Sequence, residues 1–197
     1  MKTSILQAIE DAIRAIEFLK HPNSVAFIEA ATTMIVECFQ QNKKLLIAGN
    51  GGSMCDALHF AEELTAQFRG PRRALPAIAL SEQGFLTAVG NDMGFEQVFS
   101  RGVEALGLPG DVFIALTTSG NSSNLIRAVQ AAKGKELKTI SFLGKTGGLL
   151  RGQSDLEWIV PGFTYSDRIQ EAHMTAIHII IEQVEHALFS SPQVSMV

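Results

Sequence analysis

The sequence has few of the residues that mark secreted or membrane-spanning proteins. Only two cysteines, Cys38 and Cys55, occur among its 197 residues, and they form no CxxC pair. We expect free thiols, buried or beside a site, in a reducing cytoplasm. No run approaches the roughly 18 uninterrupted apolar residues of a membrane span, since AIHIIIEQV is interrupted by Glu182. The N-terminus also lacks a signal peptide's apolar region, so we predict a cytoplasmic protein without a membrane partner.

The chain also lacks a surplus of positive charge. Its formal net charge is −4, and its basic cluster is RGPRR at 69–73, which we interpret as a solvated loop. Nothing here predicts a nucleic-acid partner. An acidic protein can still bind phosphate, however, if backbone amides and a helix N-terminus supply the local positive potential.

The order of apolar patterns predicts an α/β fold in one domain. Helical periodicity covers 2–20 and 23–41, and a long helix is predicted from Ser166 onward. Between them lie short, nearly continuous apolar runs typical of strands buried on both faces of a parallel sheet, at 43–49, 75–80, 111–118, 137–144 and 156–161. Alternating strands and helices predict a doubly wound sheet.

The predicted domain organisation is a single domain over 1–197. Residues 1–41 form a helical extension, residues 42–190 form the α/β core with the C-terminal helix, and the final SSPQVSMV is expected to be frayed. The two leading helices have no strand between them, so we expect their apolar stripes, and the excess of the last helix, to be buried by subunit association.

Two loops at predicted strand ends suit an anion. GNGGS at 49–53 offers glycines for positive φ or close backbone approach, and a serine at a helix start. TTSGNSSN at 117–124 offers several hydroxyls before a predicted helix, although a plain capping turn explains it about equally well. GNGGSM fails the dinucleotide fingerprint at Met54, and Glu82 near the second strand keeps a nicotinamide site only as a weak alternative.

Two helices carry candidate catalytic side chains. His59 and Glu63 are four residues apart, so they share a helix face, although spacing alone favours an ordinary surface pair. Gln170 and His178 are eight apart on the last helix, about 12 Å along its axis. That separation strains a shared metal site, so either both side chains lean inward or two copies of the chain contribute. By itself, a histidine within AIHIII is more often a core residue.

Five stretches together resemble the SIS (sugar isomerase) domain family: GNGGS, HFAEEL, VGNDMGFEQVFSR, TTSGNSSN and DRIQEAHMTAIHIIIEQVE. The resemblance runs in order along nearly the whole chain. It implies a flavodoxin-like three-layer sandwich with a five-stranded parallel sheet, N-terminal helices used in oligomer packing, and a homotetramer with sites at subunit interfaces. It further implies conversion of sedoheptulose 7-phosphate to D-glycero-D-manno-heptose 7-phosphate for bacterial lipopolysaccharide.

The same resemblance assigns roles to individual residues. It makes Glu63 the base and His178 the acid of an aldose–ketose isomerisation, and it implies zinc held by His59, Glu63, Gln170 and His178. A carboxylate that binds metal loses basicity, so whether Glu63 does both is left open. The residues implied to bind the sugar phosphate are Asn50, Gly51, Gly52, Ser53, Asn91, Asp92, Thr118, Ser119, Ser122, Asp167 and Gln170.

The sequence departs from the family pattern at the edge of the expected site. Gln67 stands where relatives often have Arg or Lys, and SEQGF replaces a polar turn. The alternative function is a non-catalytic SIS tetramer that binds a replication initiator. Such relatives tend to lose the His–Glu pair and the last-helix histidine, whereas His59, Glu63 and His178 are all present here, so we favour an enzyme.

Overall fold

The computed structural model describes residues 1–189, and the tail expected to be frayed lies outside this range. Five parallel strands form one sheet in the order β2-β1-β3-β4-β5. The predicted doubly wound sheet is therefore confirmed, with the flavodoxin-like strand order. The elements are α1 (Lys2–Glu17), α2 (Pro22–Gln40), β1 (Leu45–Gly49), α3 (Gly52–Thr65), β2 (Ala77–Ala79), α4 (Gln83–Asp92), α5 (Val98–Leu106), β3 (Val112–Thr117), α6 (Ser123–Gly134), β4 (Lys138–Gly144), β5 (Leu156–Val160) and α7 (Ser166–Phe189), with short 3₁₀ turns at Phe18–Lys20, Phe95–Gln97 and Gly148–Leu150.

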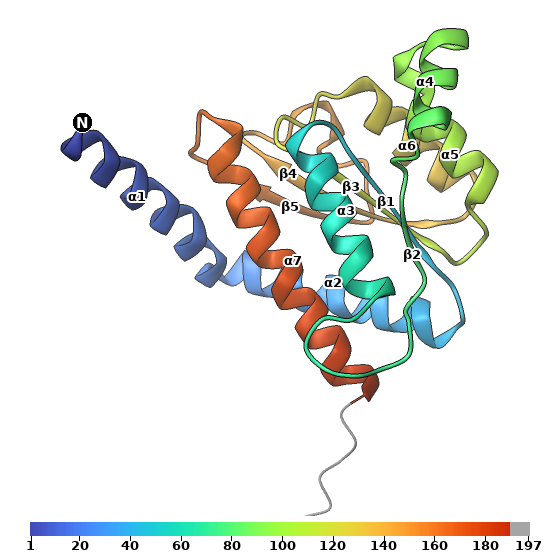
Figure 1. The fold of residues 1–197 in the computed structure, drawn as a ribbon, viewed down its shortest axis with the longest axis horizontal. Helices are drawn as coiled ribbons and strands as arrows, with labels where there is room; N and C mark the ends of the chain where they lie inside the picture. The colour runs from blue at the N-terminus through green and yellow to red at the C-terminus, as the bar shows by residue number, and fades with distance from the viewer. Residues whose placement is uncertain (190–197) are drawn as a thin grey trace, which may run out of the picture.

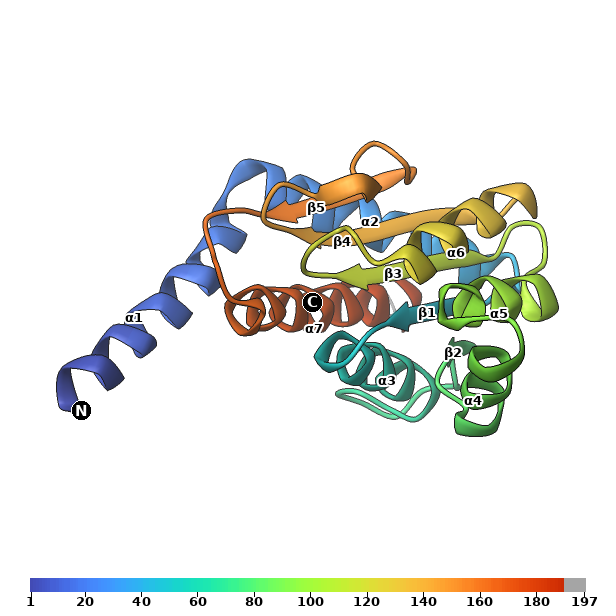
Figure 2. The same ribbon diagram turned by 90° about the horizontal axis from the view of Figure 1, so that it is seen from above.

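The strands have continuous apolar sequences because helices cover both faces of the sheet. In β1, Leu45 and Ile47 belong to one core cluster, whereas Leu46 and Ala48 belong to the other, as the alternation of side chains along a strand requires. Helices α2, α3 and α7 pack on the first face, and α5 and α6 pack on the second. Figures 1 and 2 show α7 and α3 on one side of the sheet and α5 and α6 on the other.

Two of the three helices expected to bury their apolar stripes by subunit association, α2 and α7, bury apolar residues within the chain. Helix α2 buries Phe27, Ile35 and Phe39 against α7, β3 and β5 within the chain. Helix α7 likewise buries one apolar face from Ile169 to Val184 in the same cluster. The sequence pattern was ambiguous because a helix on a sheet face needs the same apolar stripe as a helix at a subunit interface.

Helix α1 differs, since its stripe stays largely uncovered. Ile5 is 54% exposed, Ile9 49%, Ile13 46% and Ile16 44%, and these positions recur along one helix face. Figures 1 and 2 show this helix projecting from the rest of the molecule. That subunit packing covers this apolar surface remains a prediction.

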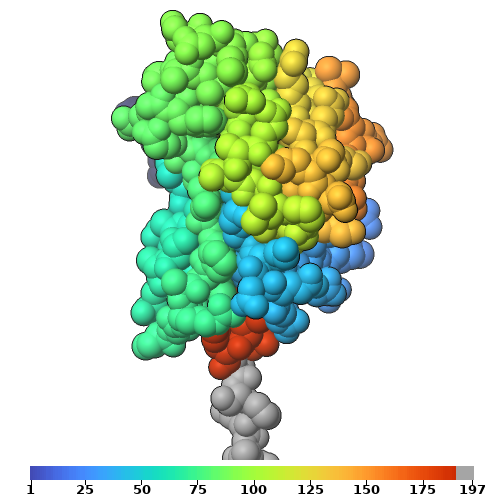
Figure 3. Space-filling view, turned by 90° about the vertical axis from the view of Figure 1, so that its right-hand side faces the viewer, coloured from blue at the N-terminus to red at the C-terminus, as the bar shows by residue number. Residues whose placement is uncertain are grey.

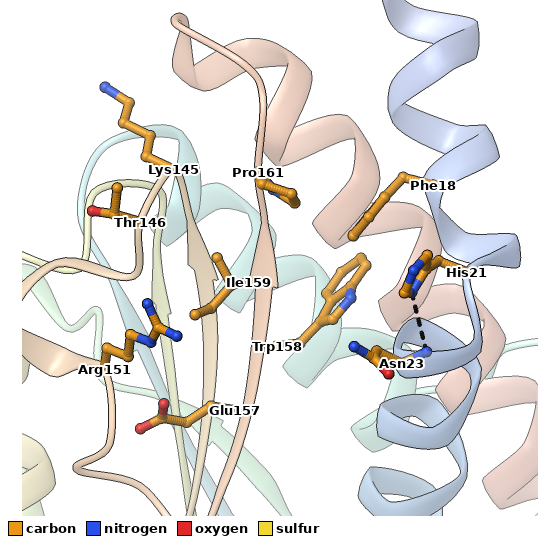
Figure 4. A pocket seen from close by; sticks show the side chains of 10 residues that line it. All are labelled: Phe18, His21, Asn23, Lys145, Thr146, Arg151, Glu157, Trp158, Ile159 and Pro161. Carbon is orange, nitrogen blue, oxygen red and sulfur yellow. Dashed lines mark hydrogen bonds between the residues drawn. The ribbon is translucent and has the colours of Figure 1, made fainter.

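A hollow of about 610 Å³ opens beside β5, where α1 meets α2 (Figure 4). The rings of Phe18 and Trp158 stack there with centroids 6.3 Å apart, and the Trp158 indole N–H donates to the Ser24 hydroxyl. The Glu157 carboxylate of β5 accepts three backbone N–H groups of the preceding loop. None of the predicted site residues lines this hollow, so the expected chemistry must be sought elsewhere.

Among the helices formed by residues 1–189, none combines the length and the hydropathy needed to cross a membrane.

Candidate active site

The two predicted anion loops meet at the centre of one sheet edge. Strands β1 and β3 are hydrogen-bonded neighbours, with Gly49 opposite Leu116, so the loops after Gly49 and Thr117 leave the sheet side by side. The strand order reverses here, because β1 leads outward to β2 whereas β3 leads outward to β4. Ligands of open parallel sheets bind at this switch point.

The glycines of the first loop have two different functions. Gly51 has φ +56°, which favours a residue without Cβ. Gly49 is needed for close packing, since a Cβ there would lie 2.4 Å from the Ser53 carbonyl oxygen. Gly52 leaves room for the Gln170 amide, whose nitrogen would lie 2.6 Å from an added Cβ. Gly51 therefore faces open space at the start of α3, whereas Gly52 lies against Gln170 of α7.

An amide pair fixes the two loops to each other. The Asn50 Nδ2 donates to Asn124 Oδ1 at 3.0 Å, and Asn124 Nδ2 donates back to Asn50 Oδ1 at 2.9 Å. Asn124 is 2% exposed, so the pair is shielded from water. The sequence interpretation included Asn50 but missed Asn124, which stood in a hydroxyl-rich turn with no feature that assigned it a partner.

In the second loop, three hydroxyl groups form hydrogen bonds within the chain. The Ser122 hydroxyl does not form the helix-capping hydrogen bond that its position would allow. The Thr117 hydroxyl accepts from the Gly120 N–H, and the Ser119 hydroxyl accepts from the Asn121 N–H. The Thr118 hydroxyl donates to Ser166 at the start of α7, next to the exposed Asp167. Ser122 occupies the N-cap of α6 but makes no capping hydrogen bond with its side chain. Its hydroxyl therefore remains available, which favours a ligand role over a plain cap.

Within a single chain, α3 and α7 bring His59, Glu63 and His178 together. The His59 Nε2 lies 3.2 Å from Glu63 Oε1, and the His59 and His178 rings have centroids 5.0 Å apart. One donor atom from each residue lies within 4.8 Å of the other two. The group exceeds an ordinary surface pair and needs no second copy of the chain to form. Two imidazoles and a carboxylate are donors that zinc commonly takes, so this set fits such an ion.

Gln170 occupies a different place on the same side of α7. Its Nε2 lies 3.5 Å from the Ser53 hydroxyl, at the first turn of α3 and beside the glycine loop. The eight-residue spacing from His178 thus separates the two side chains along α3, as the sequence suggested. Membership of Gln170 in the metal set remains a prediction, whereas its contact with Ser53 connects α7 to the anion loops.

Comparison with known proteins gives the family. Residues 8–144 match the family model described as SIS domain. The chain is 51% identical over 173 residues to a phosphoheptose isomerase from Fusobacterium nucleatum subsp. nucleatum, covering 88% of this chain and 89% of that one. The chain belongs to the phosphoheptose isomerase family of SIS domain proteins.

Solved structures of phosphoheptose isomerases have the same fold. One from Francisella tularensis superposes with a TM-score of 0.88 at 34% identity, covering 93% of this chain and 97% of that chain. Another from Neisseria gonorrhoeae has a TM-score of 0.84 at 36% identity, covering 93% and 98%. The resemblance recognised in the sequence is confirmed, and so is the flavodoxin-like α/β fold that it implied.

Electrostatics in this phosphoheptose isomerase relative favour a neutral imidazole at His178. Burial lowers the pKa of His178, the neighbouring His59 and Arg69 lower it further, and the Glu63 carboxylate opposes them. A neutral imidazole has the lone pair that a metal needs.

Two residues implied by the phosphoheptose isomerase resemblance lie apart from this group. Asn91 and Asp92 end α4, and Asn91 Nδ2 donates to Asp92 Oδ1 on the exposed surface. Figures 1 and 2 show α4 on the side of the molecule away from α7, and Figure 3 shows the green surface of α4 at the far end from the red end of α7. Neither residue belongs to the His59–Glu63–His178 group.

The weak nicotinamide alternative finds no support in this family member. The Glu82 carboxylate accepts the backbone N–H groups of Gly84 and Phe85, so it caps α4. These hydrogen bonds lower the pKa of Glu82. Its place near the end of β2 is explained by capping.

The segment 66–76, which we call the strap, corrects the interpretation of RGPRR as a solvated loop at Arg72, whereas Arg69 and Arg73 are exposed as expected. It leaves the end of α3, crosses the end of α7 and returns to β2 (Figure 1); in Figure 3 the teal-to-green surface of α3 and the strap lies beside the red end of α7. The Arg72 side chain is only 2% exposed and pairs with Glu185 of α7. The Phe68 ring stacks on His178 with centroids 5.8 Å apart. The sequence did not reveal these contacts, because a basic cluster ordinarily faces solvent.

Proposed function

We propose that this chain is a phosphoheptose isomerase that converts sedoheptulose 7-phosphate to D-glycero-D-manno-heptose 7-phosphate, for the heptose of bacterial lipopolysaccharide. The observation that carries this proposal is the group of His59, Glu63 and His178, which the fold assembles from two helices beside the anion loops. Relatives named phosphoheptose isomerase at about half identity support it.

The phosphate binds, in this proposal, where the loops after β1 and β3 meet. Ser53, Thr118, Ser119 and Ser122 supply hydroxyl groups there, and the N-terminal turns of α3 and α6 supply backbone N–H groups and a favourable dipole. The sugar then extends along α3 past Gln170 toward His59 and Glu63. Binding energy from the phosphate, remote from the reacting carbons, holds the sugar in place for proton transfer.

The reaction moves one proton between neighbouring carbons and exchanges the carbonyl and hydroxyl groups. Glu63 removes the proton from C1 of the ketose and returns it to C2, while His178 exchanges protons with the sugar oxygens. Each positioned acid or base typically contributes about 10²–10⁴ in rate. A carboxylate has two oxygens, so one can face His59 while the other takes the proton.

We further propose that His59, Glu63 and His178 hold zinc, with Gln170 as a fourth ligand. When bound, the metal supplies positive charge that stabilises negative charge on the sugar oxygen. The donor set supports this assignment, because neutral imidazoles and a carboxylate lie within reach of one another.

The proposal includes a homotetramer with sites shared between subunits. The uncovered isoleucines of α1 provide an apolar surface for association. We propose that Asn91 and Asp92, which end α4, serve the sugar bound at another subunit. Sedimentation velocity tests the assembly: Ile9→Glu with Ile13→Glu should convert tetramers to smaller species, and an unchanged sedimentation coefficient would contradict the role of α1.

Turnover decides between the enzyme and the alternative SIS tetramer that binds a replication initiator. Purified protein mixed with sedoheptulose 7-phosphate should form the aldose, and metal analysis should find zinc. The presence of the His59–Glu63–His178 group favours this outcome. No turnover combined with tight binding to an initiator protein would establish the alternative instead.

A further inference from the structure

Arg72 has an unusual environment for a residue in a surface loop. Its side chain is 2% exposed, and its Nε donates to Glu185 Oε1 of α7, whose side chain is 12% exposed. A buried charge of this kind persists only where a partner charge and hydrogen bonds replace the lost water. Arg72 therefore has a fixed position between two helices.

The other guanidinium nitrogens of Arg72 bind the last turn of α3. Nη2 donates to the Glu63 carbonyl oxygen at 2.6 Å, and Nη1 donates to the Leu64 carbonyl oxygen at 2.9 Å. Carbonyl groups in the last turn of a helix have no N–H partner within the helix and carry partial negative charge. The planar guanidinium satisfies two of them and a carboxylate at once, which an ammonium group cannot do with the same geometry.

The two anchoring points lie close in sequence to the two groups that the proposed reaction uses. On α3, Arg72 binds the peptide carbonyl of Glu63 itself. On α7, Glu185 lies seven residues, about two turns, after His178 and so lies on the same face of the helix. A single side chain thus connects the backbone of the carboxylate to the helix that carries the imidazole.

A second contact of the strap leads to the same imidazole. The Phe68 ring stacks on His178, and the Arg69 guanidinium lies over Phe68 at 5.3 Å from its centroid. Arg69 also pairs with Glu182 of α7. Its side chain is 60% exposed, however, so this pair is screened by water and fixes the strap less firmly than Arg72 does.

We propose that Arg72 is a positioning residue that sets the place of Glu63 relative to His178, by bonding the end of α3 to Glu185 of α7. The inference rests on the proposed function, in which Glu63 and His178 form the reacting and metal-binding set. The donor atoms lie within 4.8 Å of one another, and a misplacement of about 1 Å in such a site can cost about 10²-fold in rate.

The test compares Arg72→Met with Arg73→Met. Arg73 is the neighbouring residue with the same charge, and it is exposed. Arg72→Met should lower both the affinity for zinc alone, measured by calorimetry, and kcat by about 10- to 100-fold, the usual effect of losing a group that orients a ligand. KM should change less than about twofold, since the phosphate loops lie at the other end of α3. Arg73→Met should leave all three values unchanged.

Two further variants separate positioning from general stability. Arg72→Lys keeps the charge opposite Glu185 but cannot reproduce the forked contacts, so Tm should recover while zinc affinity stays low. Recovery of zinc affinity by lysine would show that only the charge matters, and would overturn the proposal. If Arg72→Met fails to fold, Glu185→Gln takes its place, with an expected loss of zinc affinity of about three- to tenfold.

The decisive contrary result is zinc affinity and kcat in Arg72→Met, or in Glu185→Gln, within twofold of Arg73→Met. Failure of the proposed function is a separate outcome. A parent protein that binds zinc without turnover contradicts the isomerase proposal, while its zinc affinity still measures the effect of Arg72. If the unmodified protein shows turnover but no zinc affinity, the metal assignment is contradicted, and kcat alone tests the role of Arg72. If it shows neither, both the isomerase proposal and the metal assignment are contradicted.

Discussion

Two of the three histidines of helix α7, His173 and His178, lie on faces that meet different surroundings. His173 faces the sheet, is completely buried, and its Nε2 lies 3.0 Å from the Leu143 carbonyl oxygen among the rings of Phe142 and Trp158. His178 faces α3 and meets His59 and Phe68 at a partly open surface. The first face is surrounded by apolar groups and the second by titratable ones.

This difference teaches that the neighbours of a histidine, more than its own helix, decide its role. Burial lowers the pKa of His173 to about 4, so its imidazole is neutral and structural. The pKa of His178 is also lowered, first by burial, but a carboxylate and a second imidazole lie beside it. The same residue type therefore stabilises the core on one face and forms a candidate site on the other.

The largest expected effect is on the α3-facing side. Glu63→Gln removes the proposed base while keeping the shape of the side chain, so kcat should fall by about 10²–10⁴ with Tm and assembly unchanged. Steady-state kinetics with sedoheptulose 7-phosphate measures it. Glu29→Gln is the matched control, since Glu29 is an exposed glutamate in the middle of helix α2. Equal kcat in the two variants would contradict the assignment of the base.

Exchanging the histidines for glutamine sharpens the comparison itself. His178→Gln should lower kcat by about 10² or more and weaken zinc binding, with little change in Tm, because this imidazole is partly exposed. His173→Gln should leave the site chemistry intact but destabilise the chain by about 1–3 kcal/mol, because a buried amide cannot satisfy all of its hydrogen bonds there. Urea unfolding and kinetics on both variants check this, and a reversed pattern would break the comparison.

Only part of this contrast between the two faces of α7 could be predicted from the sequence. Local sequence patterns correctly predict the five strands, the loops at 49–53 and 117–124, and the shared helix face of His59 and Glu63. Local patterns do not separate His173 from His178, since each follows an apolar residue in one helix, and only the family resemblance selects His178. That distinction depends on the angle at which α7 crosses the sheet and α3, which is a property of tertiary packing.

The strap shows the same limit of prediction from local sequence patterns. Arg72 and Arg73 are adjacent and chemically identical in the sequence, yet one is buried against Glu185 and the other is exposed. The partner of Arg72 lies 113 residues away. No local pattern reports such a pairing, so a resemblance to a family or a structure is needed to find it.

Acid should destabilise the sheet-facing side of α7 in a defined window. The folded-state pKa of His173, about 4, lies below its ordinary value of 6.5, so the unfolded chain binds the proton more tightly. The stability from the neutral imidazole is present above pH 6.5 and is lost as the pH falls toward 4, by about 3 kcal/mol in all. Urea unfolding at fixed protein concentration should show a flatter profile for His173→Phe over this window, and parallel profiles would contradict the role of His173.

The smallest effect is expected at the anion loops. Variants there separate phosphate binding from the proton transfer proposed for the side of α7 that faces α3. Ser119→Ala with Ser122→Ala removes two hydroxyls proposed to bind the phosphate, so KM should rise about tenfold with kcat nearly unchanged, since a hydrogen bond to a charged group contributes about 1.5–3 kcal/mol and water replaces part of it. Ser123→Ala is the matched control, because Ser123 is the exposed first residue of α6. An unchanged KM in the double variant would place the phosphate elsewhere, and a fall in kcat alone would show that these hydroxyls act on the reacting end of the sugar.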